Sequence, residues 1–296
     1  MTVKAAVGQI CSTASIKHNL DQCVQLVAKA ALGGAKILFL PEASDYIAAD
    51  AQASLQLAVP QSWSPFVQGL RSAARQHCIA IQVGIHATTD TGAKLLNRVV
   101  YIKPDGQIDE AATYDKLHVF DYGSLRESAT VQPGGRLTAP FDSPVGRIGS
   151  LICFDVRFAE PSLALTQPAT TSPWATRPAQ VLTYPSAFTV ATGRAHWETL
   201  VRARAIETQS WVVAAAQVGR HNAVRVSYGH SIVVDPWGEV KLKLGGVGDG
   251  HEPPEQGVDE AELGFVQMDV QLVEQTRKQM PLQRRLDVYR LECNNL

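Results

Sequence analysis

Short apolar runs alternate with amphipathic stretches along most of the chain. In the first amphipathic stretch, apolar residues recur at helical spacing at Leu20, Val24, Val27 and Ala31, and a Gly-Gly pair follows at the expected helix end. The same criteria predict helices at 16–34, 64–78, 196–210 and 269–280. They predict strands at 4–8, 35–42, 79–86, 180–188, 211–219, 229–244 and 263–270.

Two antiparallel hairpins interrupt this alternation. One spans 96–116 with a Pro-Asp-Gly turn at 104–106, and the other spans 139–153 with a turn at 143–146. Strand–helix–strand crossovers mixed with hairpins predict an α/β fold in which sheets pack face to face and helices cover the outside. We find no linker and no internal repeat, so we expect a single domain over 1–296.

Three segments have no clear place in this pattern. Residues 51–62 fit a helix or a loop. Residues 166–180 are rich in Pro, Thr and Ala, which predicts a surface insertion. Residues 245–260 are rich in Gly, Pro and acidic residues, which predicts a mobile loop.

The composition narrows the class of protein. With 45% hydrophobic residues, 19% charged residues and a net charge of -1, the chain is typical of a soluble globular protein. It has no electrostatic signature for nucleic acid or an anionic membrane, no membrane-length apolar run and no expected signal peptide. Five dispersed cysteines without a CxxC pair favour a cytoplasmic protein without disulfides. The histidines do not cluster at ligand spacing, so we expect no metal.

Reactive side chains come just after several predicted strands. Glu42 follows the run "ILFLP", Lys116 follows the first hairpin, and Cys153 ends the second. In open α/β folds the carboxyl ends of strands form the crevice that binds ligands. Each residue also has an ordinary interpretation: a turn or cap glutamate, half of a surface ion pair beside Asp115, and a small buried hydrophobe.

The context of Cys153 favours a nucleophile. A turn or helix is expected to begin soon after it, and unpaired N–H groups at a helix start would lower the thiol pKa toward neutrality. A thiolate nucleophile also needs a base and an oxyanion donor. Glu42 could serve as the base and Lys116 could neutralise the oxyanion. The candidate histidine bases, none in a recognisable Cys–His protease context, are His118, His196 and His230.

Three segments resemble the catalytic motifs of the nitrilase (carbon–nitrogen hydrolase) superfamily, and in the same order. They are "FLPEASDY", "YDKLHVFD" and "LICFDVRFAEPSLAL". Further segments resemble its amidase branch, which contains deaminated-glutathione amidase and ω-amidase: "RESATVQPGG", "TYPSAFTVATGRAHWETLVRARAIETQ", "GHSIVVDPWGE" and "MPLQRRLDVY". The phrases "FLPEASDYI" and "RESATVQPG" bring the chain closest to deaminated-glutathione amidase. The resemblance covers nearly the whole chain and implies a four-layer α-β-β-α sandwich.

The resemblance also implies roles for individual residues. Glu42 is the general base, Lys116 the oxyanion-stabilising donor and Cys153 the nucleophile, while Glu127 orients the lysine and the substrate. A buried lysine between two carboxylates would keep its charge, which agrees with these roles. We expect the backbone N–H of Phe154 to complete the oxyanion hole, as in other sites where the residue after the nucleophile donates. No cofactor is expected.

An amide substrate with an acidic end would need a fixed cation. Arg157 is the first candidate, because a guanidinium binds a carboxylate bidentately. The alternative is an ion pair of Arg157 with Glu160 or Asp155. By resemblance Phe188 and Thr189 line the same pocket, and otherwise they are ordinary packing residues at a strand end.

Three functions fit these residues. The first is an amidase that hydrolyses deaminated glutathione, a metabolite-repair reaction, through a Cys thioester. The second is an ω-amidase acting on small α-keto acid amides such as α-ketoglutaramate, and the third is a non-catalytic binding protein on the same scaffold. The resemblance further implies a homodimer in which residues 270–296, a C-terminal helix and tail, contact the partner subunit. The insertion at 166–180 is longer than the connection in relatives and would shape pocket access or a subunit contact.

Overall fold

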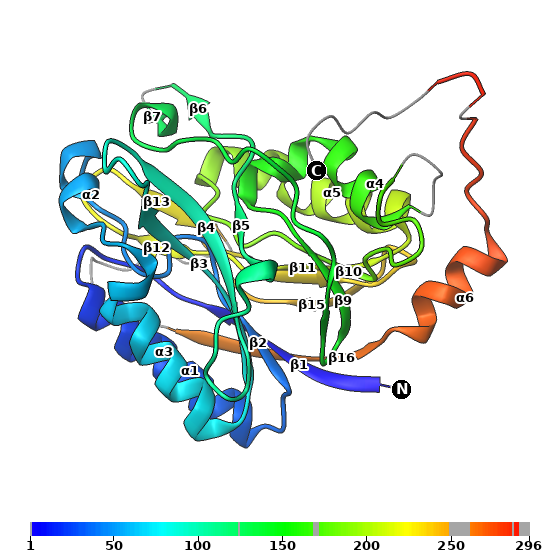
Figure 1. Cartoon of the computed structure of the whole chain (residues 1–296), viewed down its shortest axis with the longest axis horizontal. Helices are drawn as coiled ribbons and strands as arrows, with labels where there is room; N and C mark the ends of the chain where they lie inside the picture. Colours follow the sequence, from blue (N-terminus) through cyan, green and yellow to red (C-terminus); the bar gives the residue numbers. More distant parts are fainter. Residues whose placement is uncertain (1, 124, 168–171, 249–260, 286, 290–296) are drawn as a thin grey trace.

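The computed structural model of the protein describes residues 2–123, 125–167, 172–248, 261–285 and 287–289. Two six-stranded sheets lie face to face between two pairs of helices (Figure 1). The predicted α/β fold with four layers in the order α-β-β-α is therefore confirmed.

The first sheet has the strand order β16-β1-β2-β3-β4-β5. Its three central strands, β1 to β3, run parallel, and antiparallel strands flank them on both sides. The predicted hairpin at 96–116 forms β4 and β5, with Gly106 at its turn in the left-handed region (φ 80°). The bounds are β1 (Thr2–Gln9), β2 (Ile37–Phe39), β3 (Ala80–Thr88), β4 (Leu95–Ile102), β5 (Tyr114–Asp115) and β16 (Glu262–Asp269).

The second sheet repeats this plan in the order β15-β14-β11-β10-β9-β8. Strands β9, β10 and β11 are parallel, and the predicted hairpin at 139–153 supplies β8 and β9. The bounds are β8 (Phe141–Ser143), β9 (Gly146–Ser150), β10 (Val181–Thr183), β11 (Trp211–Ala214), β14 (Ile232–Val234) and β15 (Val240–Lys243). Two small two-stranded sheets pair β6 (Asp121–Tyr122) with β7 (Leu125–Arg126) and β12 (Val218–Arg220) with β13 (Val226–Tyr228).

Helices cover the outer face of each sheet. Helices α1 (Ile16–Leu32) and α3 (Pro65–His77) pack on the first sheet, and α4 (Ala159–Thr166) and α5 (Val190–Thr208) pack on the second (Figure 1). Helix α2 (Ala51–Leu57) buries no residue, and α6 (Gln271–Gln279) follows β16. No helix within the described part of the chain has the length and apolar character that a membrane crossing requires.

The layers follow from the alternation of side chains along each strand. In the first sheet Ala6 and Leu38 face the helices, whereas their neighbours Ala5 and Ile37 face the second sheet. The central strands are thus buried on both faces, which explains their continuous apolar runs.

The start of α5 differs from the prediction by six residues. Helix α5 begins at Val190 rather than 196, because the Thr189 hydroxyl caps it by accepting a hydrogen bond from the N–H of Thr192 at 3.3 Å. Gly193 disfavours a helix locally, so the sequence pattern does not predict this first turn. The glycine is needed because the ring of Tyr228 packs against it and leaves no room for a side chain. Residues 51–62 form α2 and a 3₁₀ turn, η1 (Gln61–Trp63).

The predicted surface insertion at 166–180 is only partly at the surface. Its described residues are 166–167 and 172–180, and four of them are buried: Thr166, which ends α4, Gln167, Ala179 and Gln180. Between these buried ends, residues 172–178 form a turn that is tied back to α4 by a hydrogen bond from Ser172 Oγ to the Ala164 carbonyl (2.7 Å). Most of the described residues after α6 are exposed, including Val288 and Tyr289. Residues 168–171 of the insertion, 249–260 of the expected mobile loop, and residues 286 and 290–296 of the tail lie outside the described residues.

Candidate active site

Glu42 is held at the end of β2 by a close backbone contact with β3. The Gly84 N–H donates to the Pro41 carbonyl (3.0 Å), and the Ser44 N–H donates to the Gly84 carbonyl (2.9 Å). A Cβ on Gly84 would lie 2.6 Å from the Cα of Glu42, closer than side-chain atoms pack. Glycine at this position therefore lets the loop carrying Glu42 lie directly on β3.

Lys116 follows β5 and lies between two carboxylates. Its Nζ is 2.9 Å from Glu42 Oε1 and 2.8 Å from Glu127 Oε2, and only 2% of its side chain is exposed. Burial alone would lower the pKa of Lys116, but the charges of Glu127 and Glu42 raise it well above its usual value. The ammonium stays charged, as the sequence predicted for a lysine in this setting.

Glu127 comes from a 3₁₀ turn, η3 (Glu127–Ala129), that lies beyond β7. Both of its carboxylate oxygens accept from Lys116 Nζ, and Oε2 also accepts from the Phe120 N–H at 2.6 Å. The carboxylate is thus fixed from two directions and holds the lysine in place.

Asn97 is a site residue that the sequence analysis missed. It lies on β4 with 4% of its surface exposed, and its Nδ2 donates to Glu42 Oε1 (2.7 Å) and to Glu127 Oε1 (2.9 Å). Its main-chain carbonyl accepts from the N–H of Lys116 at 2.9 Å. A lone asparagine inside a strand pattern carries no signal for this role.

Cys153 opens a 3₁₀ turn, η4 (Cys153–Arg157), three residues after β9 ends. Its backbone has φ 46°, in the left-handed region that residues with a Cβ rarely adopt. The Cys153 N–H donates to the Pro185 carbonyl at 3.0 Å, which fixes this conformation, and the thiol lies close enough to Glu42 for the charge of that carboxylate to act on it. The structure thus brings together all four predicted catalytic side chains, from segments 42, 116, 127 and 153.

The predicted lowering of the Cys153 pKa is wrong. Burial raises the thiol pKa well above its usual value, the Glu42 charge raises it further, and the Lys116 charge only partly opposes them. The start of η4 does not compensate, since the thiol lies inside the protein beside a carboxylate. The resting nucleophile is therefore a thiol.

Glu42 has the complementary protonation state. Burial acts to raise its pKa, but the charge of Lys116 and the hydrogen bonds from Lys116, Asn97 and Cys153 outweigh burial and lower it. An ionised carboxylate thus lies close to a protonated thiol, which is the arrangement that general-base catalysis requires.

Asp155 connects the loops that carry Lys116 and Cys153, and the sequence analysis did not identify this role. It is fully buried, and its carboxylate accepts from the N–H of His118 (3.0 Å), the hydroxyl of Tyr114 (2.7 Å) and the N–H of Ile152 (2.9 Å). His118 Nδ1 also lies 2.7 Å from the carboxylate. Residues on either side of Lys116 are thereby joined to the residue before the nucleophile. His118 thus pairs with Asp155 instead of the thiol.

Arg157 lies against aromatic rings near the nucleophile. Its guanidinium carbon is 5.6 Å from the ring centroids of both Phe154 and Phe188, and Nη2 is 3.2 Å from His196 Nδ1. Among the described residues Arg157 forms no ion pair with Asp155 or Glu160, so the alternative explanation of this arginine is wrong.

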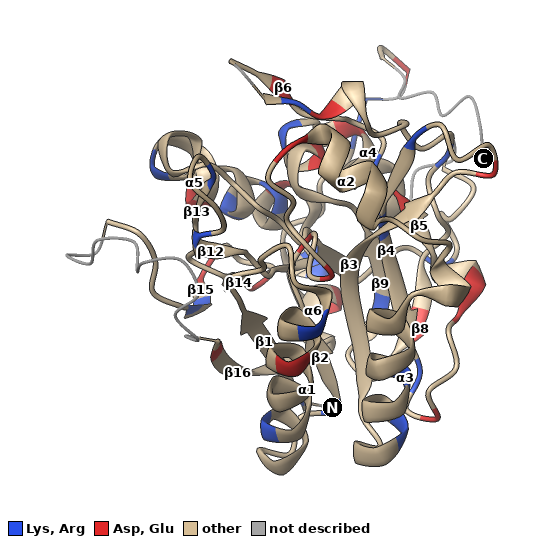
Figure 2. Ribbon diagram, turned by 90° about the vertical axis from the view of Figure 1, so that its left-hand side faces the viewer, with Lys and Arg blue, Asp and Glu red and all other residues tan. Residues whose placement is uncertain are grey.

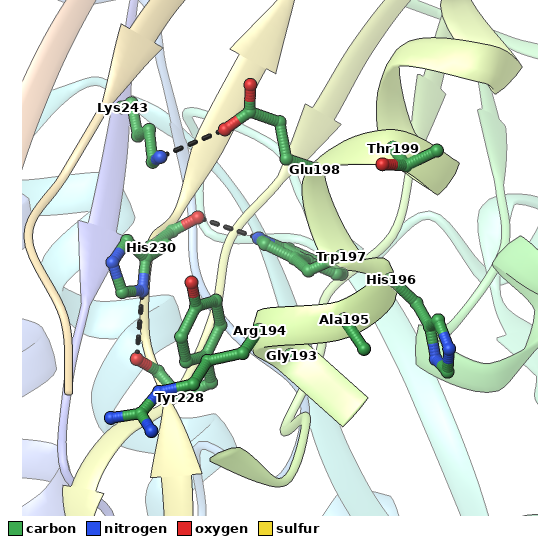
Figure 3. Close-up of a pocket in the computed structure, with 10 residues that line it drawn as sticks. All are labelled: Gly193, Arg194, Ala195, His196, Trp197, Glu198, Thr199, Tyr228, His230 and Lys243. Carbon is green, nitrogen blue, oxygen red and sulfur yellow. Dashed lines mark hydrogen bonds and ion pairs between the residues drawn. The ribbon is translucent and has the colours of Figure 1, made fainter. Parts of the chain in front are cut away.

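The other predicted pocket residues have clear packing roles. Phe188 is buried and packs on the ring of Trp197, 4.7 Å between centroids. The hydroxyl of Thr189 caps α5, as described above. A separate pocket of about 100 Å³ lies where α5 passes β13 and β15 (Figure 3), and its walls include Arg194, Tyr228 and His230 but none of the four catalytic candidates. Figure 2 shows Lys and Arg residues interspersed with Asp and Glu residues along the ribbon, in keeping with the near-neutral net charge.

Comparisons with known proteins show the family to which the chain belongs. A family model described as carbon–nitrogen hydrolase matches residues 4–278. The chain therefore belongs to the carbon–nitrogen hydrolase family, and it is a hydrolase of carbon–nitrogen bonds.

Individual relatives lie in the same family. The chain is 39% identical over 291 residues to a Schizosaccharomyces pombe protein named probable hydrolase nit2, covering 96% of this chain and 98% of that one. It is 40% identical over 295 residues to deaminated glutathione amidase of Bos taurus, covering 96% and 82%. The crystal structure of the Caenorhabditis elegans NitFhit protein matches with a TM-score of 0.85 at 37% identity, covering 99% of this chain and 68% of that chain.

Proposed function

We propose that this protein is an amidase in which Cys153 is the nucleophile, Glu42 the general base and Lys116 the oxyanion-stabilising cation. The observation that carries the proposal is the position of the Lys116 ammonium, 2.9 Å from Glu42 and 2.8 Å from Glu127, with the Cys153 thiol close enough for the charges of Glu42 and Lys116 to act on it. Such a site contains an acceptor for the thiol proton and a fixed positive charge for the tetrahedral intermediate.

The proposed reaction has two stages. In the first, Cys153 Sγ attacks the amide carbonyl while Glu42 takes the thiol proton, and Lys116 with the Phe154 N–H stabilises the oxyanion. Glu42 then gives the proton to the leaving nitrogen, the C–N bond breaks, and a thioester remains. In the second stage Glu42 removes a proton from water, which attacks the thioester, releases the carboxylic acid and restores the thiol.

The substrate we propose is deaminated glutathione, because relatives about 40% identical over most of their length carry that name. Arg157 has no acidic partner among the described residues, and we propose that it binds the carboxylate of the α-keto acid end between Phe154 and Phe188. The small amide α-ketoglutaramate shares this end and differs in its leaving group.

Rates of hydrolysis of deaminated glutathione and α-ketoglutaramate test the assignment. We expect faster turnover of deaminated glutathione, a thioester on Cys153 detectable by mass spectrometry, and loss of turnover in Cys153→Ala and Glu42→Gln. Faster turnover of α-ketoglutaramate would make the protein an ω-amidase. No turnover of either amide and no thioester would overturn the proposal in favour of a binding protein.

We also propose a homodimer located in the cytoplasm. The exposed Val288 and Tyr289 after α6 support a partner contact by the C-terminal segment. Light scattering of the whole protein and of a variant ending at residue 280 tests this: the whole chain should have twice the monomer mass. If each protein has twice the mass of its own monomer, the residues after 280 are not required for the dimer.

A further inference from the structure

Asn97 bonds to both carboxylates of the site and to the backbone of Lys116. Its side-chain amide donates to Glu42 at 2.7 Å and to Glu127 at 2.9 Å, and its carbonyl accepts from the backbone of Lys116. The pairing of β4 with β5 produces this arrangement, since it places Asn97 beside the residue that follows β5. No other uncharged side chain in the described residues bonds to both glutamates.

The hydrogen bond from Asn97 to Glu42 determines which oxygen of the base can accept a proton. Glu42 Oε1 already accepts from Lys116 Nζ at 2.9 Å, so the bond from Asn97 gives this one oxygen two strong donors. The Cys153 thiol lies close to the same carboxylate, whose charge acts on it. An oxygen with two donors is a poor proton acceptor, which leaves Oε2 as the atom available to take the thiol proton.

The carboxamide itself is oriented only through its donor end. Among the described residues none donates to the buried Asn97 Oδ1. A buried acceptor without a partner is unfavourable, and such groups deserve a functional explanation. A side chain selected for packing alone would not need this polar group in the site.

We propose that Asn97 is a positioning residue that fixes the rotation of the Glu42 carboxylate and directs a single oxygen toward the Cys153 thiol. This inference rests on the proposed role of Glu42 as general base. The neutral amide suits the position because it supplies donors without changing the charge of the cluster, which is one ammonium and two carboxylates. Lys116, Glu127 and Cys153 are the titratable groups that face Glu42.

The test measures the pH dependence of Cys153 reactivity in the Asn97→Ala and Asn97→Asp variants. The probe is iodoacetamide, with alkylation of the Cys153 peptide followed by mass spectrometry, so the result does not depend on the identity of the substrate. Removing a hydrogen-bond donor from a carboxylate raises the pKa of that carboxylate. The acidic limb of the alkylation profile, the pH range in which alkylation slows as Glu42 is protonated, should therefore move upward by about one pH unit in Asn97→Ala. Asn97→Asp, which adds a third carboxylate, should move it further.

Turnover adds a second readout. The substrate is whichever of deaminated glutathione and α-ketoglutaramate the wild type hydrolyses. On it, kcat of Asn97→Ala should fall about 10- to 100-fold, with a smaller change in KM, because a misplaced base affects the chemical step. The matched control is Gln22→Ala. Gln22 is another buried amide with an unpartnered oxygen, but its Nε2 donates to the main-chain carbonyl of Cys11. Gln22→Ala should lose stability without moving the acidic limb.

The possible failures are separable. Acidic limbs at the wild-type position in both Asn97 variants would overturn the positioning role, provided that Glu42→Gln has lost the pH-dependent reactivity. Wild-type reactivity and turnover in Glu42→Gln would instead overturn the proposed function. An equal shift in Gln22→Ala would show that loss of stability moves the limb, and would also overturn the inference.

Discussion

Replacing Lys116 by Met tests whether the buried ion cluster is as tightly coupled as its geometry indicates. Methionine has a similar length and no charge, so the change removes the ammonium while filling most of its space. The carboxylates of Glu42 and Glu127, whose side chains are 6% and 17% exposed, would then lie next to each other without a cation. Removing one partner of a buried ion pair costs about 3 to 5 kcal/mol, because the remaining charge is uncompensated.

The cost should depend on pH with a definite sign. In the wild type the pKa of Glu42 is lowered on folding, so its ionisation stabilises the protein above the unfolded pKa and is lost as pH falls through the folded value. In Lys116→Met the two carboxylates lose their cation and repel each other, so burial is no longer outweighed and the pKa of Glu42 should rise above its unfolded value. The variant therefore regains stability as pH falls, because protonation removes the buried charge.

Thermal unfolding between pH 5 and 8 measures this difference. At pH 8 the melting temperature of Lys116→Met should lie roughly 10 °C below that of the wild type. At pH 5 the difference should shrink to less than half. The double variant Lys116→Met/Glu127→Gln, which removes one of the two charges, should recover part of the loss at pH 8. A difference that is constant with pH, or a double variant no more stable than Lys116→Met, would refute the reasoning.

Two further changes test contacts that support the site, one between backbone segments and one between side chains. Gly84→Ala places a Cβ 2.6 Å from the Cα of Glu42, so the loop must move, and kcat should fall by at least about 10-fold in steady-state kinetics. The control is Gly135→Ala, because no atom lies within 4 Å of a Cβ at that position. Equal activity of the two variants would contradict the close-contact argument. Tyr114→Phe removes one hydrogen-bond donor to the buried carboxylate of Asp155. The free energy of unfolding, measured by urea denaturation, should fall by about 1 to 3 kcal/mol. An unchanged value would show that the hydroxyl contributes little.

The layers of the fold are predictable because strand periodicity decides which face each residue occupies. Ala5 and Ala6, adjacent in the sequence, enter different apolar cores, and the same alternation holds for Val181 and Leu182. The start of α5 was not predictable in this way. Its first turns contain Gly193, which disfavours a helix locally, and the reason for the glycine is Tyr228, which is distant in the sequence.

The catalytic residue types are visible in the sequence, but their supporting contacts are not. Glu42, Lys116 and Cys153 stand out because acid, base and thiol groups at strand ends are chemically distinctive. Asn97 and Asp155 do not, because one lies in an ordinary strand pattern and the other resembles a helix-start carboxylate. Their roles depend on which segments the topology brings together: β4 beside β5, and η4 beside residues 114–118.

The sign of the Cys153 pKa shift shows what local sequence leaves open. A helix start lowers a thiol pKa, and that local contribution can be predicted from the residues that follow the cysteine. The contributions that exceed it are burial and the charge of Glu42, which is 111 positions away in the sequence and close to the thiol in the fold. This outcome changes the proposed chemistry as well as the pKa. A thiolate at rest would need no base for the first step, whereas a thiol beside an ionised carboxylate requires Glu42 to take the proton as sulfur attacks. The orientation of that carboxylate then controls the rate, which is why the neighbouring amide of Asn97 matters to the reaction.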